Sequence, residues 1–310
     1  MSMKLSVVVP VYGCPEALNP LHSRLVKTLS ELTKSYEIIF VNDGCPKNSW
    51  KEIRKICSID KKTIGINLSR NFGQLHSTNA GLNYATGDYV VLMDCDLQDR
   101  PESIKELFNE VENGYDIVFA RRLNRKDSKL TLFLSKMFYK VYNSLVDGNY
   151  DGNIGNYCIA KKNILEEYNR INDNNKSFTT VLSWMGYKSK IIDIEGDERY
   201  EGKSSYTLSR KIDLAIDMLT SQSNKPLKAV VYLGIIFSIF SFIFLIFQIV
   251  KYFVYKNITE GWTSIIAAIF LMGGLTLTCL GCVGIYVGNI FNQTKGVPEY
   301  LVSEIINGKK

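Results

Sequence analysis

The fold of this chain can be inferred from one stretch, Tyr89-Val90-Val91-Leu92-Met93-Asp94-Cys95-Asp96-Leu97-Gln98-Asp99. Its first five residues form a short apolar run, which is typical of a strand buried on both faces of a mostly parallel sheet. Three aspartates follow at the carboxyl end of that strand, at the sheet edge where open α/β folds bind ligands. Gathered oxygen ligands suit Mg²⁺ or Mn²⁺, which usually share their coordination with substrate phosphates. The stretch therefore predicts an α/β fold with a metal site at the edge of its sheet.

A second interpretation is that the aspartates only cap a helix. Pro101 has the place of a first-turn proline, so Asp99 suits the N-cap of that helix or the position just before it. Capping leaves Asp94 and Asp96 unexplained, because closely spaced carboxylates repel unless a cation or hydrogen-bond donors relieve them. We therefore assign Asp94 and Asp96 to a metal on a nucleotide or diphosphate, and Asp99 to the helix cap.

Strands and helices alternate from the amino terminus to Arg122. Five leucines recur at helical spacing between residues 18 and 32 and predict an amphipathic helix there. The expected strands are 5–12, 36–41, 63–68, 89–93 and 117–120, and the expected helices are 18–32, 49–58, 74–85 and one from residue 101. This alternation implies right-handed crossovers and a parallel sheet covered on both faces. The absence of GxGxxG after the first strand argues against a dinucleotide-binding Rossmann site.

The alternation weakens after Arg122, as expected for a region that builds an acceptor site. We expect helices at about 129–146 and 178–185 and a strand at 157–161. A polar loop at 199–206 then leads to an apolar stripe beside Arg210 and Lys211, which predicts an interfacial helix at 207–226.

Two stretches, 229–250 and 262–291, contain no charged residue. Each exceeds the ~20 residues that a membrane-spanning helix needs. Lys and Arg concentrate on one side of the predicted pair, at positions 210, 211, 225, 228 and 295, whereas the joining loop has only Lys251 and Lys256. The positive-inside rule therefore predicts an integral membrane protein whose bulk domain and termini are cytoplasmic. The net charge of +6 fits anionic lipid and not nucleic acid.

The seven cysteines are scattered, and a cytoplasmic domain is expected to keep its thiols reduced. Cys279 and Cys282 spell CxxC, but they lie in the second apolar stretch beside Gly284 and Gly288, whose GxxxG spacing suits close helix packing. That spacing favours a homo-oligomer over a redox or zinc site. The chain has only two histidines, which argues against a histidine-rich metal site.

The motifs together resemble the family 2 glycosyltransferases of the GT-A fold, in particular the polyprenyl-phosphate glycosyltransferases, which include dolichol-phosphate mannose synthase and the bactoprenol glucosyltransferases. The resemblance covers essentially the whole chain. Its carriers are Val9-Pro10-Val11-Tyr12, Val41-Asn42-Asp43-Gly44, Leu68-Ser69-Arg70-Asn71-Phe72-Gly73, Asp94 to Asp99, Arg199 to Tyr206 and the terminal pair of apolar helices. The implied fold is a GT-A, Rossmann-like sheet flanked by helices, followed by an interfacial helix and two transmembrane helices.

The resemblance also implies roles for residues. Asp94 and Asp96 match the DxD motif that holds Mg²⁺ or Mn²⁺ on the donor diphosphate, with Gln98 nearby. The implied catalytic residues are Asp96, Gln98, Asn156 and Arg199. The implied donor-binding residues are Pro10, Tyr12, Asp43, Arg70, Asp94, Arg121, Lys203, Ser204 and Tyr206.

Three positions depart from the commoner family pattern. Gly155-Asn156-Tyr157-Cys158 replaces Gly-Asp-aromatic-Arg, so both the acid and the arginine are absent. Ser204-Ser205-Tyr206 replaces Ser-Lys-Tyr, with Lys203 as a substitute, and Gly13-Cys14 replaces Asn-Glu, with Glu16 as a stand-in. Because the metal motif is intact, these changes favour a subgroup with a different sugar.

The sequence thus predicts an inverting, metal-dependent glycosyltransferase that moves one sugar from a nucleotide sugar, with a UDP-sugar favoured, to a polyprenyl phosphate at the cytoplasmic membrane face. The alternatives are another membrane lipid acceptor and a non-catalytic scaffold that binds nucleotide sugars. The expected domains are a GT-A domain at 1–206, a juxtamembrane helix at 207–226, a transmembrane hairpin at 227–295 and a cytoplasmic tail at 296–310.

Overall fold

The computed structural model describes residues 3–123, 137, 140, 143–144, 154–173, 176–197, 200, 225–255 and 261–308. They fall in two compact units. The sheet unit comprises residues 1–143, 148–205 and 298–310, and the two-helix unit comprises 144–147 and 206–297. Most of the expected helix at 129–146, nearly all of the loop at 199–206 and the interfacial helix up to residue 224 lie outside the described residues.

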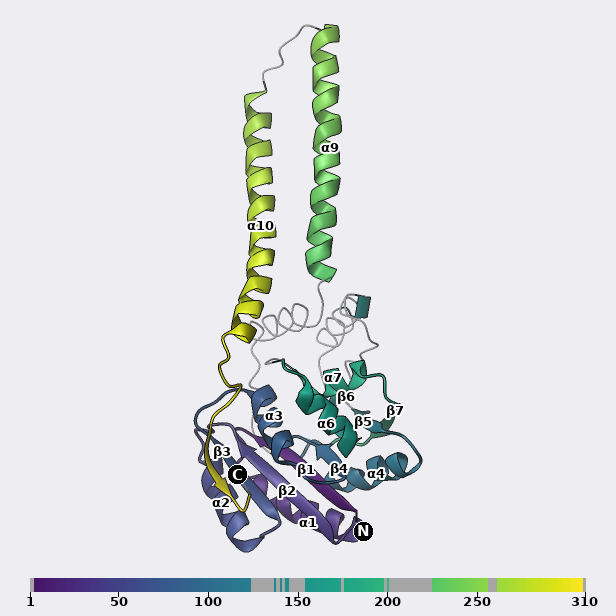
Figure 1. The fold of residues 1–310 in the computed structure, drawn as a ribbon, viewed down its shortest axis with the longest axis vertical. Helices are drawn as coiled ribbons and strands as arrows, with labels where there is room; N and C mark the ends of the chain where they lie inside the picture. The colour runs from purple at the N-terminus through teal and green to yellow at the C-terminus, as the bar shows by residue number, and fades with distance from the viewer. Residues whose placement is uncertain are drawn as a thin grey trace. The chain divides into compact units, whose positions relative to one another are not determined.

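An eight-stranded sheet forms the centre of the sheet unit (Figure 1). Its strands are β1 Lys4–Val11, β2 Ser35–Asn42, β3 Thr63–Leu68, β4 Tyr89–Leu92, β5 Ile117–Arg122, β6 Ile154–Lys161, β7 Ser189–Ile194 and β8 Val302–Ile306. They lie in the order β7-β5-β6-β4-β1-β2-β3-β8. β4, β1, β2 and β3 are parallel to one another, as are β5 and β7, whereas β6 and β8 run antiparallel to their neighbours. The expected mostly parallel α/β sheet is confirmed.

Helices cover both faces of this sheet. They are α1 Leu18–Leu32, α2 Ser49–Ile59, α3 Gln74–Tyr84, the 3-10 turn η1 Pro101–Ser103, α4 Ile104–Glu112, α6 Lys162–Arg170 and α7 Phe178–Trp184. Side chains of α1, α2 and α4 share one buried cluster with Val7, Val9 and Val11, whereas those of α3, α6 and α7 share the other with Val8. Alternate residues of β1 thus enter opposite cores, which is why its apolar run is continuous.

The leucine stripe of α1 packs as the sequence predicts. Leu18, Leu21, Leu25 and Leu29 are completely buried, while Leu32 packs partly buried at the edge of the same cluster. Each buried leucine contributes about 1.5–3 kcal/mol relative to an exposed one, so this stripe fixes α1 on the sheet.

Helix α3 lies close to the other face because residue 81 is glycine. A Cβ there would come within 3 Å of the Val8 and Val41 side chains. This approach places the start of α3, and with it Gln74, beside the carboxyl ends of the central strands.

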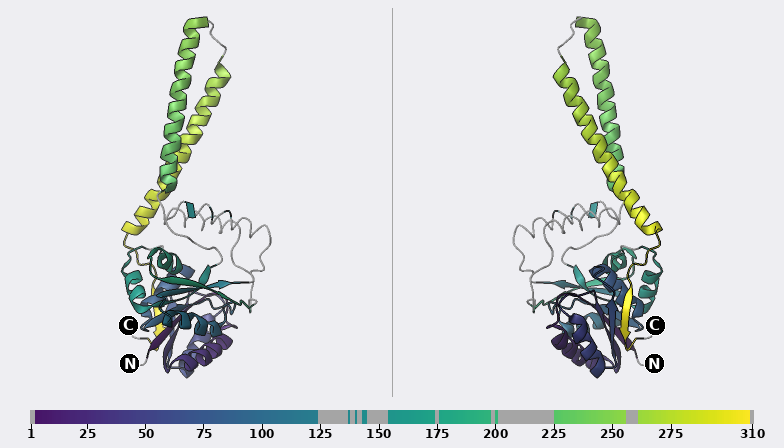
Figure 2. Two further views of the ribbon diagram at one scale, coloured as in Figure 1. Left: turned by 90° about the vertical axis from the view of Figure 1, so that its right-hand side faces the viewer. Right: turned by 90° about the vertical axis from the view of Figure 1, so that its left-hand side faces the viewer.

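Three elements were not predicted. Helix α6 has a largely polar sequence, and β7 has half-exposed residues in alternation, so neither shows a long apolar run. Strand β8 belongs to the segment expected to be a tail, and it pairs antiparallel with β3. Figure 2 shows β8, in yellow, among the purple and blue elements of the amino-terminal part of the chain.

In the two-helix unit the described residues form α9 Lys225–Tyr255 and α10 Trp262–Thr294. Within them, Leu227–Phe244 has a mean hydropathy of 2.2 and Leu271–Phe291 one of 1.7. Both helices expected from the charge-free stretches are therefore present, and each is long and apolar enough to cross a membrane.

Candidate active site

The candidate site lies where the order of the strands reverses. The chain passes from β1 through α1 to β2 and through α2 to β3, and α3 then returns it to the other side of β1 as β4. Open α/β sheets bind ligands outside the carboxyl ends of the strands at such a switch point. Pro10 is buried near the end of β1, Tyr12 just beyond it is 46% exposed, and Asp94 and Asp96 follow the neighbouring β4.

Asp43, after β2, holds the loop that precedes α3. One of its carboxylate oxygens accepts the Phe72 N–H at 2.7 Å and the other accepts the Gly73 N–H at 2.9 Å. Burial raises the pKa of Asp43, although these two hydrogen bonds oppose the shift. The Arg70 guanidinium lies 4.5 Å from the centre of the Phe72 ring. Asp43 thus fixes the loop that carries Arg70 to the edge of the sheet.

Gly44 permits this close packing of two loops. Its φ is +58°, and a Cβ at this position would come within 3 Å of the backbone of Arg70 and Asn71. The Asp-Gly pair therefore has a structural reason: the aspartate binds the facing loop and the glycine leaves room for it.

Asp94 is the carboxylate that other polar side chains surround. Gln74 donates to its Oδ1 from 2.7 Å and Asn156 from 3.3 Å. Burial raises the pKa of Asp94 to about 6, and the charges of Asp99 and Asp96 add to the shift. An aspartate at position 156 would add another negative charge beside Asp94, so the departure to asparagine changes the electrostatics of the metal motif itself.

Asp96 and Gln98 lie in the turn that follows. The Gln98 N–H donates to an Asp96 carboxylate oxygen at 3.2 Å, and the Tyr200 N–H donates to the Asp96 carbonyl at 3.1 Å. Leu97 between them has a φ of +61°, which is uncommon for a residue with a side chain. The turn is therefore held in an unfavourable backbone conformation by its surroundings.

The assignment of Asp99 to helix capping is wrong. The 3-10 turn η1 has Arg100 at its N-cap with no side-chain hydrogen bond, and the Asp99 side chain instead accepts the Arg122 Nε–H at 2.7 Å. Arg122 also donates to Gln98 Oε1 at 3.2 Å. The burial of Asp99 explains the difference, because leaving a buried carboxylate without a charged partner costs more than leaving a short helix without a cap.

Arg122 is the arginine beside the acidic cluster that Asp94, Asp96 and Asp99 form. Arg121, one of the residues expected to bind the donor, has its guanidinium against Asp193 of β7, with Nε–Oδ1 at 2.6 Å and Nη2–Oδ2 at 3.0 Å. Consecutive residues of a strand point to opposite faces, so only one of the two arginines reaches the DxD turn.

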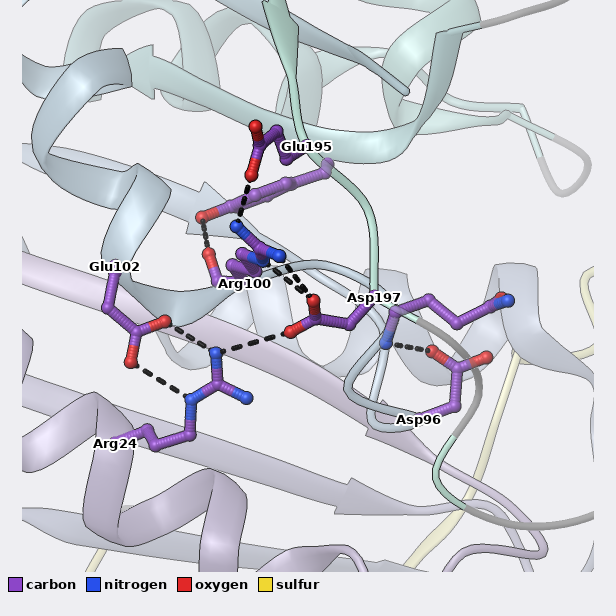
Figure 3. A network of polar contacts seen from close by, with 8 residues as sticks. Arg24, Asp96, Arg100, Glu102, Glu195 and Asp197 are labelled. Atoms are coloured by element: carbon purple, nitrogen blue, oxygen red, sulfur yellow. Dashed lines mark hydrogen bonds and ion pairs between the residues drawn. The ribbon is translucent and has the colours of Figure 1, made fainter. Parts of the chain in front are cut away.

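A network of charged side chains anchors the segment that precedes residue 198 (Figure 3). Asp197 accepts the Arg100 Nε–H at 2.8 Å, and Glu195 accepts an Arg100 Nη1–H at 2.6 Å. Arg24 of α1 binds Glu102 at 2.6 Å and lies 3.7 Å from Asp197. The Asp197 N–H also donates to the Gln98 carbonyl at 3.0 Å. This segment therefore lies directly beside the turn that carries Asp96.

The expectation of reduced thiols is wrong for two cysteines. Cys14 in the loop after β1 and Cys95 between the two DxD aspartates form a disulfide, with their Cα atoms 6.6 Å apart. β1 and β4 are neighbouring parallel strands, so their carboxyl-terminal loops are adjacent and bring the two cysteines together. The departure from Asn-Glu to Gly13-Cys14 thus places one half of a cross-link at the site.

The residues present fit a divalent cation that shares its coordination with a substrate. Asp94 and Asp96 offer carboxylate oxygens, and the charges of Asp99 and Asp96 add to the burial that raises the pKa of Asp94. In the part of the chain that the structure describes, no group of three or more His, Cys, Asp or Glu side chains is arranged to hold a metal. Two carboxylates completed by phosphate oxygens and water are a common shell for Mg²⁺.

The structure thus brings Tyr12, Asp43, Asp94, Asp96 and Asn156 to one edge of the sheet. Arg199, Lys203, Ser204 and Tyr206 lie outside the described residues. Sequence reasoning missed Gln74 and Arg122 as partners of the acidic cluster, since their contacts depend on where α3 and β5 pack. The adjacent arginines at positions 121 and 122 indicated a basic side chain near the site, but the strand register determines which of the two contacts the aspartates.

Comparison with known proteins agrees with this geometry. The profile of the family described as "Glycosyl transferase family 2" matches residues 6–169. This chain belongs to glycosyl transferase family 2. The resemblance inferred from the sequence is therefore confirmed, and so is the transferase class.

Relatives match the chain over nearly its full length. The prophage bactoprenol glucosyl transferase homolog of Escherichia coli is 31% identical over 306 residues, which is 98% of this chain and 99% of that protein. The bactoprenol glucosyl transferase of Shigella phage SfX is 32% identical over 303 residues, 97% of this chain and 99% of that protein. The uncharacterized glycosyltransferase YkcC of Bacillus subtilis is 33% identical over 306 residues, 97% of this chain and 94% of that protein.

Solved structures share the fold. Mannosyl-3-phosphoglycerate synthase from Rubrobacter xylanophilus aligns with a TM-score of 0.50 and 14% identity over 69% of this chain and 73% of that chain. Glucosyl-3-phosphoglycerate synthase from Mycobacterium tuberculosis, solved in complex with Mn²⁺, UDP and phosphoglyceric acid, has a TM-score of 0.50 and 13% identity over 71% of this chain and 77% of that chain. The GT-A fold expected from the sequence is confirmed.

Proposed function

We propose that this chain transfers one sugar from a nucleotide sugar, with a UDP-sugar as the favoured donor, to a polyprenyl phosphate at the cytoplasmic face of a membrane. The observation that carries the proposal is the pair Asp94 and Asp96 at the switch point of the sheet, in a chain that also has two apolar helices of membrane-spanning length. The relatives named bactoprenol glucosyl transferase, which match end to end, support the polyprenyl acceptor.

Asp94 and Asp96 are the residues that would hold Mg²⁺ or Mn²⁺ on the donor diphosphate. When bound, the ion supplies positive charge against the negative charge that grows on the leaving nucleoside diphosphate. Gln74 and Asn156 donate to Asp94 and so fix the direction of its carboxylate. Arg122 neutralises Asp99, which leaves the charge of the other two aspartates for the cation.

The acceptor needs positioning more than activation. A phosphate monoester has a second pKa of ~6, so at neutral pH it is already an anion that can attack the anomeric carbon. In-line attack by that oxygen inverts the anomeric centre, and an α-linked donor gives a β-linked product. By the family resemblance, Arg70, Arg199, Lys203, Ser204 and Tyr206 contact phosphates or the donor.

Transfer of a radiolabelled sugar to defined lipids tests this proposal. Purified full-length protein in detergent is given Mn²⁺, a panel of labelled nucleotide sugars and one of three acceptors: undecaprenyl phosphate, diacylglycerol or no added lipid. We expect a labelled, organic-soluble product only with undecaprenyl phosphate. Because a phosphate-linked sugar is labile to mild acid, the label is also expected to be released by that treatment.

Two other results would contradict the proposal in different ways. Label that enters diacylglycerol and resists mild acid would indicate another lipid acceptor. Binding of nucleotide sugar without transfer to any acceptor would indicate a scaffold.

A further inference from the structure

Three cysteines lie at the ends of three neighbouring strands. Cys95 follows β4, Cys14 follows β1 and Cys45 follows β2, and these strands are consecutive in the sheet. Cys14 and Cys95 form the disulfide, and their residues are only 4% and 7% exposed. A bulky reductant therefore has little direct access to this bond.

Cys45 is the free thiol beside that disulfide. It is half-buried, and its Sγ accepts the Gly13 N–H at 3.2 Å and the Ser49 hydroxyl at 3.1 Å. Gly13 directly precedes Cys14, so the sulfur of Cys45 is hydrogen-bonded to the residue next to one end of the cross-link. Burial opposes ionisation of this thiol, but hydrogen bonds from Ser49, Gly13 and Lys47 outweigh burial and hold the pKa of Cys45 below its usual value.

The other described cysteines of the sheet unit have inert surroundings. Cys57 and Cys158 are completely buried. Burial raises the pKa of Cys57 to about 12 and that of Cys158 well above its usual value. Because the thiolate is the nucleophile in exchange reactions, Cys45 is distinguished from both by position and by chemistry.

We propose that Cys45 begins a thiol–disulfide exchange that opens and closes the Cys14–Cys95 bridge beside the DxD aspartates. The Cys45 thiolate attacks Cys14 Sγ, a Cys14–Cys45 bond forms, and Cys95 leaves as a thiolate that takes up a proton. An external dithiol then attacks Cys45, releases Cys14 as a thiol, and leaves as a cyclic disulfide when its second sulfur frees Cys45. The dithiol loses two electrons and the protein bridge gains them; an external disulfide reverses the sequence.

The disulfide connects two segments of the candidate site. It ties the loop after β1, which carries Tyr12, to the turn that carries Asp94 and Asp96 and contains Leu97 at positive φ. A residue in such a conformation persists only while its surroundings hold it there. Reduction removes one of those restraints, so the reduced protein binds a metal–nucleotide complex more weakly. This consequence rests on the proposed function, whereas the exchange itself does not.

The exchange is tested by trapping thiols in the full-length protein. Wild type, Cys45→Ala and the matched control Cys57→Ala are oxidised with glutathione disulfide, treated with dithiothreitol, quenched in acid at intervals and alkylated, and the Cys95 peptide is quantified by mass spectrometry. We expect Cys95 to be released at similar rates in wild type and Cys57→Ala, and about tenfold more slowly in Cys45→Ala. Equal rates in all three proteins, or no Cys14–Cys95 peptide after oxidation, would overturn the proposal.

A second variant traps the intermediate. In Cys95→Ala, oxidation is expected to join Cys14 to Cys45, and recovery of both as free thiols would contradict the proximity that the exchange needs. Calorimetric titration with Mn²⁺ and UDP then tests the consequence, with an expected loss of affinity of about threefold or more on reduction of wild type. Equal affinity in both states overturns the coupling to the site. No binding in either state contradicts the proposed function, while the trapping result still decides the exchange.

Discussion

Two adjacent arginines show how one residue of difference in a strand changes the role of a side chain. Arg122 pairs with Asp99, whose side chain is 1% exposed, whereas Arg121 pairs with Asp193 and both of those side chains are 39% exposed. An exposed ion pair is screened by water and contributes little. Removing one partner of a buried pair leaves an uncompensated charge in the interior.

Substituting each arginine by methionine tests this difference. We expect Arg122→Met to lower the free energy of unfolding by about 3–5 kcal/mol because Asp99 stays buried without its partner. We expect Arg121→Met, the matched control, to cost about 0–1 kcal/mol. Urea unfolding of the full-length variants in detergent measures both, and equal losses would contradict the burial argument.

The residues of the site were predictable where they belong to a short sequence motif at the end of a strand. Asp94, Asp96 and Asp43 follow apolar strands directly, so the sequence alone brings them to one edge of the sheet. Gln74 contacts Asp94, 20 positions away in the chain, and Arg122 contacts Asp99, 23 positions away. These contacts depend on the packing of other elements. The expectation of reduced thiols rested on the predicted compartment, whereas the disulfide follows from the adjacency of the loops after β1 and β4.

At the level of the elements, Glu37 links neighbouring strands at the end of the sheet opposite the candidate site, near the start of β2. It lies on β2 and is 6% exposed. Its carboxylate accepts hydrogen bonds from Lys4 and Ser6 of β1, both at 2.6 Å, and from the Thr86 N–H before β4 at 2.7 Å. Burial opposes ionisation of Glu37, but these donors outweigh burial and hold its pKa below the usual value.

This arrangement predicts a pH-dependent stability. Because the pKa of Glu37 is lower in the folded state, its ionised form stabilises the fold above the unfolded pKa of about 4.3, and the contribution is lost as the pH falls through the folded pKa. We expect Glu37→Gln to cost about 1–3 kcal/mol at pH 7 and progressively less below pH ~4. Thermal unfolding of Glu37→Gln and of the exposed control Glu112→Gln across this range measures the effect. A loss of stability in Glu37→Gln that is the same at every pH would contradict this prediction.

The central elements were predictable because their patterns are strong and local. β1 to β4 are apolar runs, and α1 has a leucine stripe. β8 is a short edge strand whose pairing with β3 depends on residues some 240 positions earlier in the chain, for example the hydrogen bonds from Asn307 to the carbonyls of Cys57 and Thr63. No local pattern contains that information.

At the scale of the whole molecule, the chain leaves the sheet unit after residue 205 and returns to it at residue 298. The distribution of Lys and Arg predicts that both of these connections are cytoplasmic and that the loop joining α9 and α10 is on the opposite side. We expect a cysteine introduced as Thr259→Cys to react with an impermeant maleimide in right-side-out vesicles and not in inverted ones. Labelling of this cysteine only in inverted vesicles would indicate the opposite topology.

We propose that Asp94 and Asp96 hold the metal-bound donor for transfer to a polyprenyl phosphate. The most direct measurement is the rate of sugar transfer to undecaprenyl phosphate, with and without Mn²⁺, for wild type, Asp96→Asn and the matched control Asp116→Asn, whose residue pairs with Lys161 at the other end of the sheet. We predict metal-dependent transfer in wild type and in Asp116→Asn, and a loss of at least about a hundredfold in Asp96→Asn with the protein still folded. Wild-type transfer by Asp96→Asn, or transfer unaffected by removal of Mn²⁺ with a chelator, would contradict the assignment of Asp94 and Asp96 to the metal-bound donor.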